Sequence, residues 1–300
     1  MPLALRLLLI ATAAALLPGC KPAPEAPIAA AAPPASSPAG AADDSPAALM
    51  AQVFPSWAAT RPHAASMPSG EGAAQEPVLV SPLEVVPLDA EHRMLLVNGV
   101  PDDGTGQPLQ LHATSVNVGA YGFERRGGRW VKTFERPSLV WTGFNGQVGE
   151  VKVHDLGAGR TALSLQNGTC GQDVCSEWVR FFALAPGDAR ALTPDLPLSR
   201  KLEDAPGCAA WLAGQPASAP DPADAFTPEN CVDVSGIWRF EPAADPAAAG
   251  WPDLVVAFKG SKAVQDGSTG QAAPRAVDEK LVLRHDGRGY QVVSGRNPLD

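Results

Sequence analysis

The chain has 300 residues and carries 32 acidic against 23 basic side chains, a formal net charge of −9 at pH 7. This balance argues against a nucleic-acid partner, because phosphates are bound by basic surfaces. It also argues against adsorption of the folded chain onto anionic lipid head groups.

Residues 1–19 have the composition of an export signal. Arg6 and the amino terminus supply positive charge, and an apolar run follows at 7–17. The run is shorter than the ~18 apolar residues that a membrane-spanning helix needs, so it is expected to be removed after export. The tetrapeptide LPGC at 17–20 resembles the lipobox of bacterial lipoproteins, in which a glycine precedes the cysteine that carries the lipid.

This resemblance implies cleavage before Cys20 and attachment of acyl chains such as palmitate to that residue. Because each buried methylene contributes about 0.8 kcal/mol, several chains anchor a protein stably. Lys21 stands where inner-membrane retention typically needs aspartate, which favours the outer membrane, with the chain facing the periplasm. An ordinary secretory peptide is the alternative, although Cys20 is the only cysteine before position 170.

Residues 20–47 are expected to form the lipidated cysteine and a disordered tether. Eleven alanines and seven prolines follow the cysteine in this stretch, and so little apolar surface cannot offset the entropy of ordering. Residues 48–77 form a lead-in, in which a short helix is predicted over 48–60 and ends near Pro55. The rest of the lead-in is expected to be irregular.

Residues 78–300 have the pattern of an all-β domain built from antiparallel sheets. The apolar run at 93–99 ends in glycine, and residues 151–153 and 162–165 alternate with period two, as half-buried strands do. Residues 121–132 predict a hairpin that turns at two consecutive glycines.

Three segments of this domain share one layout: an apolar strand that ends in glycine, a variable loop and a two-strand hairpin. They begin near positions 93, 158 and 249. The line AGWPDLVVAFKG at 249–260 resembles the FG-GAP propeller repeat, which implies an irregular propeller. A sandwich is the alternative, because any all-β chain yields such alignments by chance.

Four cysteines remain after cleavage, and an even number in an oxidising compartment predicts two disulfides. Three pairings are possible, and the local one, Cys170–Cys175 and Cys208–Cys231, is favoured. A zinc site is the alternative, but the chain has no CxxC pair and its histidines lie far from these cysteines in sequence.

No motif for catalysis is present. The chain lacks G-x-S-x-G, S-x-x-K, H-E-x-x-H and phosphate-cradling glycine loops, and its five histidines occur singly. The adjacent acids of the turn at 100–106 cannot readily converge on a calcium ion. We therefore expect neither an enzyme nor a metal or cofactor site.

Aromatic residues supply the candidate partner contacts. Among seven tryptophans, Trp141 and Trp251 lie nearest turns and are candidate anchors, since tryptophan is enriched at binding hot spots. Ser235, Gly236 and Trp238 fall in the fragment SGIW, which resembles the Ser-Gly-x-Tyr signature of periplasmic lysozyme inhibitors. That resemblance implies a loop that enters an enzyme cleft. The alternative is a plain strand, which the flanking apolar residues favour.

The layout of lipobox, tether and disulfide-linked β domain resembles that of lipoprotein immunity proteins. The resemblance implies a membrane-anchored periplasmic module that neutralises or captures a secreted peptidoglycan or lipid hydrolase. A structural or assembly lipoprotein of the outer membrane is the alternative.

Overall fold

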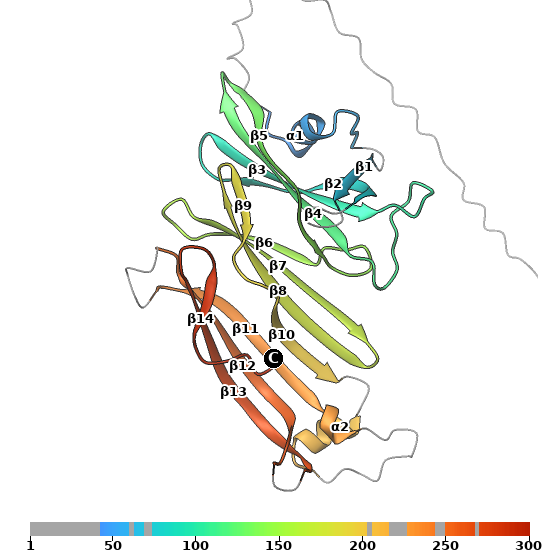
Figure 1. Cartoon of the computed structure of the whole chain (residues 1–300), viewed down its shortest axis with the longest axis vertical. Helices are drawn as coiled ribbons and strands as arrows, with labels where there is room; N and C mark the ends of the chain where they lie inside the picture. The colour runs from blue at the N-terminus through green and yellow to red at the C-terminus, as the bar shows by residue number, and fades with distance from the viewer. Residues whose placement is uncertain are drawn as a thin grey trace, which may run out of the picture. The chain divides into compact units, whose positions relative to one another are not determined.

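The structure, a computed structural model, describes residues 43–59, 63–68, 74–202, 206–215, 227–243, 250–267 and 270–300. The export signal, Cys20 and nearly all of the expected tether lie outside the described residues. Within the described ranges, none of the helices is long and apolar enough to cross a membrane. The predicted all-β class with antiparallel sheets is confirmed (Figure 1).

The described part begins with helix α1 (Pro46–Val53), which overlaps the helix predicted over 48–60. The Ser45 hydroxyl accepts a hydrogen bond from the N–H of Ala48, and Pro46 occupies the first turn, where its missing N–H costs nothing. Leu49 and Met50 are fully buried against the first sheet.

Five strands form the first sheet in sequence order, each antiparallel to the next: β1 (His63–Pro68), β2 (Gln75–Pro87), β3 (His92–Pro101), β4 (Val116–Arg126) and β5 (Arg129–Thr142). The predicted hairpin is β4–β5. It turns at Gly127 and Gly128, whose φ angles of 57° and 77° favour glycine.

Nine strands form the second sheet: β6 (Glu150–Asp155), β7 (Thr161–Gly171), β8 (Val174–Ala185), β9 (Asp188–Ala191), β10 (Leu196–Leu202), β11 (Val232–Glu241), β12 (Asp253–Gln265), β13 (Ala272–His285) and β14 (Tyr290–Ser294). Their order is β14-β13-β12-β11-β10-β8-β7-β6, and β9 pairs with β8. The sheet curls into a half-barrel (Figure 1). Two short helices, α2 (Pro206–Leu212) and the 3₁₀ turn η2 (Pro228–Asn230), connect β10 to β11.

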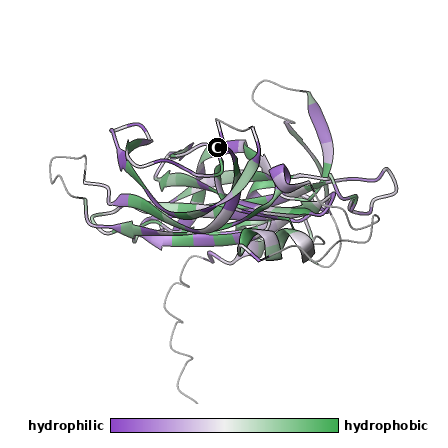
Figure 2. Cartoon of the chain, turned by 90° about the horizontal axis from the view of Figure 1, so that it is seen from below, coloured by the Kyte–Doolittle hydropathy of each residue, from purple (hydrophilic) through white to green (hydrophobic). Residues whose placement is uncertain are grey.

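Hydrophobic and hydrophilic residues both occur along the strands (Figure 2). Inward and outward positions alternate on strands of the second sheet such as β11, whereas the central strands of the first sheet bury residues on both faces. One apolar cluster lies between the sheets and includes Leu96, Val118, Leu163 and Phe182. The other face of the first sheet is covered by α1. The inner face of the half-barrel holds the third cluster, which extends from Ala162 on β7 to Tyr290 on β14.

The repeated layout corresponds to three antiparallel groups, β3-β4-β5, β7-β8-β9 and β12-β13-β14, each a strand followed by a hairpin. The second and third groups belong to one continuous sheet. They are therefore not separate propeller blades, and the implied propeller is replaced by a curled sheet.

The lead-in differs from the expectation of an irregular segment. Residues 63–68 form β1, and β2 begins at Gln75, so the β domain starts before position 78. The sequence HAASMP of β1 lacks apolar alternation. It becomes a strand because β2 offers a register-matched partner and Met67 is buried between the strands and α1.

Both cysteine pairs are within disulfide distance in the predicted local pattern. Cys170 and Cys175 lie directly opposite each other in the β7–β8 hairpin, with Cα atoms 4.0 Å apart. Cys208 on α2 and Cys231 before β11 are both buried, with Cα atoms 5.5 Å apart. The second pair therefore links α2 to the start of β11.

Candidate functional site

The curl of the nine-stranded sheet brings side chains from distant strands together on its inner face. The His154 ring on β6 lies 5.3 Å from the Trp238 ring on β11, although three strands separate β6 from β11 in the sheet. Phe181 on β8 contacts the same tryptophan at 4.8 Å between ring centroids. Edge-to-face packing of this kind fills the interior and holds the curl.

Leu192 closes one end of the half-barrel. Its N–H donates to the carbonyl oxygen of Phe181 on β8 (2.7 Å), and its carbonyl accepts from the N–H of Tyr290 on β14 (2.8 Å). Arg190 adds a hydrogen bond to the carbonyl of Arg288 in the β13–β14 turn (2.7 Å). The ring of strands from β8 through β10 to β14 is thus joined by backbone contacts at this point.

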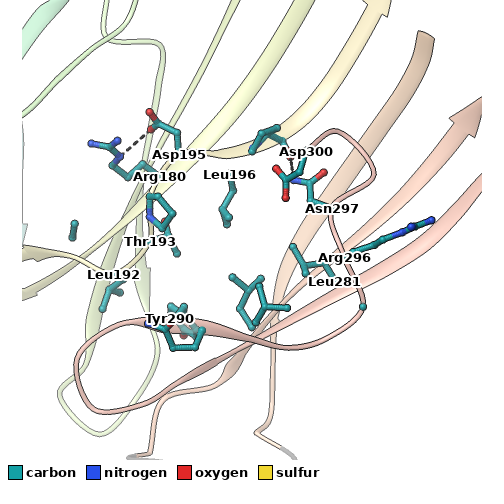
Figure 3. A pocket seen from close by; sticks show the side chains of 17 residues that line it. Arg180, Leu192, Thr193, Asp195, Leu196, Leu281, Tyr290, Arg296, Asn297 and Asp300 are labelled. Carbon is teal, nitrogen blue, oxygen red and sulfur yellow. Dashed lines mark hydrogen bonds and ion pairs between the residues drawn. The ribbon is translucent and has the colours of Figure 1, made fainter. Parts of the chain in front are cut away.

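Beyond this closure a pocket of about 780 Å³ opens between the 191–197 segment and β14 (Figure 3). We call it the mouth. Its apolar part comes from three separate segments of chain and includes Leu192, Leu196, Leu281, Leu283, Tyr290 and Val292. Its polar part comes from Arg180, Thr193, Asp195, Gln291, Arg296, Asn297 and Asp300.

The segment 295–300 forms one wall of the mouth. The Asn297 side chain is buried, donates to the carbonyl of Pro197 (2.9 Å), and accepts from the N–H of Leu299 (2.9 Å). Lys262 donates to the carbonyl of Pro298, and Leu299 packs against the inner cluster. These contacts hold the segment across β10 and β12.

Ion pairs already engage both arginines that line the mouth. Arg180 contacts Asp195 at 2.9 Å, and Arg296 donates two hydrogen bonds to Glu279, at 2.8 and 2.9 Å. The Arg296 guanidinium holds the pKa of Glu279 below its usual value. The charged side chains that line the mouth balance, two arginines against Asp195 and Asp300, and within the part of the chain that the structure describes Asp300 forms no ion pair.

His285 lies behind the mouth at the end of β13. Its ring stacks on Trp251 (5.0 Å, 18°), and the Gly287 N–H donates to its Nδ1 at 3.0 Å. Nδ1 is therefore an acceptor and Nε2 carries the proton, and the buried Nε2 has no hydrogen-bond partner among the described residues. Burial, with the neighbouring charges of Arg190 and Arg160, lowers the pKa of His285.

The SGIW fragment lies inside β11 and is not a loop: its four residues pair with β12, and Ser235 also pairs with β10. Gly236 faces inward, where a Cβ would stand 2.6 Å from the Phe258 ring, and Trp238 packs on the inner cluster. Ser235 and Ile237 point to the opposite face, where Ile237 is 75% exposed. The fragment is therefore the strand that its apolar flanks favoured, because Gly236 and Trp238 are required by interior packing.

Trp141 and Trp251 are half-buried packing residues. The Trp141 indole donates to the carbonyl of Pro68 (2.9 Å) and so holds β1 against β5. Trp251 is engaged by His285 and the inner cluster. The structure places neither ring on an open surface, and their role in partner binding stays a prediction.

The acidic turn at 100–106 uses its carboxylates locally. Asp102 accepts from the N–H groups of Gly104 (2.8 Å) and Gly106 (3.0 Å), and Asp103 accepts from Thr105 (2.7 Å). No group of His, Cys, Asp and Glu side chains within the described ranges is arranged to hold a metal ion.

Sequence reasoning did not identify the residues of the mouth. Its lining joins residues 180–197 with 281–300, and no local motif marks either segment. Only the curl of the sheet makes them neighbours. The turn sequence DGRG at 286–289 predicts the β13–β14 hairpin. It does not predict that the hairpin lies opposite the 191–197 segment.

Comparison with known proteins yields no match: no family model matches the chain, and no curated protein or solved structure is significantly similar to it.

Proposed function

We propose that this chain is a lipid-anchored envelope protein that binds a secreted hydrolase and neutralises or captures it. The observation that supports this most is the mouth of the half-barrel. It is a preformed recess of about 780 Å³ with an apolar floor and a polar rim, the combination found in sites that receive one anchoring side chain or small ligand.

The strands and ion pairs around the mouth make it a rigid surface. Apart from Leu192, its apolar residues lie on strands of one hydrogen-bonded sheet, and the rim arginines are held by carboxylate partners. A rim that is already ordered loses little side-chain entropy on binding, so more of the contact energy appears as affinity.

The negative excess of the chain favours a basic partner. Acidic groups at the rim increase the rate of encounter with a positively charged protein, and this effect weakens as salt is added. The expected anchor at Cys20 and the tether would hold the module in the periplasm, where a secreted hydrolase arrives.

The direct test uses the full chain purified from membranes in detergent and the hydrolase encoded beside its gene. Binding is expected in the nanomolar range, with loss of hydrolase activity at stoichiometric ratio. Asp195→Ala, in the rim, should slow association, whereas Glu150→Ala, an exposed and ion-paired carboxylate on β6, is the matched control.

Absence of binding, together with unchanged survival of a deletion strain attacked by siblings that secrete the hydrolase, would contradict the proposal. That result would promote the alternative, a structural or assembly lipoprotein of the outer membrane.

A further inference from the structure

β14 is an edge strand with unusual surface chemistry. Among the described residues it pairs only with β13, and it lies at the end of the nine-stranded sheet. Its sequence, YQVVS, contains neither charge nor proline. Val292 and Val293 are 57% and 50% exposed. Natural proteins usually protect such edges, because their unpaired backbone groups recruit other strands.

Two other edges of the sheets, β5 and β6, are protected in the usual way by charged side chains. β5 carries Arg129, Lys132, Glu135 and Arg136, and β6 carries Glu150, Lys152 and Asp155. β1 has no such charges, but it ends at Pro68, whose carbonyl is bound by Trp141 and Asn117. β14 differs from β1 in that it borders the mouth.

The backbone of β14 also faces the mouth. The N–H of Tyr290 points away from β13, because it donates to Leu192 on the other side of the closure. Alternation along an antiparallel strand directs the N–H of Val292 the same way. Gln291 and Val292 line the recess, so a strand added beside them would place a side chain over its apolar floor.

We propose that β14 and the mouth together bind an extended segment of a partner protein by strand addition. The segment would pair with the backbone at Val292, insert one apolar side chain toward Leu196 and Leu283, and carry a basic residue opposite Asp300. The charge preference follows because Arg180 and Arg296 each have a carboxylate partner, whereas Asp300 forms no ion pair with any described residue. The inference deepens the proposed function and rests on it only for the identity of the partner.

The test probes the full chain in detergent with a phage-displayed library of random peptides. We expect enrichment of extended sequences that contain alternating β-branched residues, an apolar anchor and a basic residue. Val292→Pro removes the outward N–H at a position where an edge strand tolerates proline, and should weaken the selected peptides by at least about tenfold. Val292→Thr keeps the N–H and the branched side chain, and should bind like the parent.

A second variant tests the site without proline, in case Val292→Pro fails to fold. Val292→Lys keeps the N–H and charges the edge as β5 and β6 are charged, so it too should lose the peptides while its melting temperature stays unchanged. No enrichment, or equal binding by all variants, would overturn the inference. A dimer in sedimentation that Val292→Lys dissociates would also overturn it, because a second copy would then be the occupant.

The two proposals fail separately. If the hydrolase binds parent and Val292→Lys equally, strand addition is wrong and the proposed function stands. If peptides are enriched through β14 but the hydrolase does not bind, the edge site stands and the proposed function is wrong.

Discussion

The N–H of Tyr290 donates to the carbonyl of Leu192 at 2.8 Å, and this contact joins β14 to the segment after β9. Leu192 bonds to β8 through its own N–H, so one residue connects the two sides of the curl. These backbone hydrogen bonds join the two sides at Leu192, and the recess lies next to them. Beyond Tyr290, β14 borders the mouth.

His285 is expected to make the stability of the fold depend on pH. Its side chain lies between Trp251 and Tyr290 and is 3% exposed, and burial lowers its pKa, as do Arg190 and Arg160. The unfolded chain therefore binds a proton more readily than the folded chain. The free energy of unfolding should be highest above about pH 6.5 and should fall as the pH drops through the lower folded-state pKa.

The measurement is urea unfolding between about pH 5 and pH 8. His285→Asn keeps an acceptor for the Gly287 N–H without a titrating ring, and should flatten the profile. The pKa of His154 is also lowered by burial and then by Lys152, so part of the slope should remain. An unchanged slope in His285→Asn would exclude His285 as its source.

The neighbours Ile237 and Trp238 lie on opposite faces of β11, so their substitutions should differ in their effect on stability. Trp238 contacts Phe181, Phe240 and His154 on the inner face, so Trp238→Ala should destabilise the fold by about 3 kcal/mol. Ile237→Ala, on the exposed face, should change the free energy of unfolding by less than about 0.5 kcal/mol. Equal effects in denaturant unfolding would show that the two faces of β11 are assigned wrongly.

The two disulfides should differ in what they stabilise. Cys208–Cys231 is buried and joins residues 23 apart in sequence, and its loss should cost about 3.5 kcal/mol in the chain-entropy model. Cys170–Cys175 spans 5 residues in a hairpin that already holds the two positions opposite each other, and its loss should cost about 2 kcal/mol. Paired Cys→Ser variants, compared by thermal melting without reductant, test the order; a larger effect at the hairpin would contradict it.

Cys20 is expected to carry the membrane anchor. Cys20→Ser should abolish acyl labelling and release the chain from the membrane fraction, or leave an uncleaved precursor, because the lipobox resemblance identifies this cysteine as the acceptor. Lys21→Ala is the matched control and should remain lipidated. Normal labelling and fractionation of Cys20→Ser would refute the lipoprotein assignment.

The all-β class, the β4–β5 hairpin and the local cysteine pairs were predictable from sequence, because each depends on residues close together in the chain. Gly127 and Gly128 specify a turn wherever the strands pack, and the period of side chains on a strand is local too. The strand β1 was missed since its pairing with β2 and the burial of Met67 determine it, and not its own propensity.

Only the tertiary structure determined which faces of the strands are buried and where the mouth remains open. Trp141, Trp238 and Trp251 look alike as sequence candidates for binding, yet each is engaged by tertiary packing: Trp141 within the first sheet, and the other two inside the curl of the second. The mouth joins Leu196 on β10 to Leu283 on β13 and Val292 on β14, across five neighbouring strands. Curvature accumulates from the twist between neighbouring strands and from side-chain volumes on the inner face, quantities that no single segment of the sequence contains.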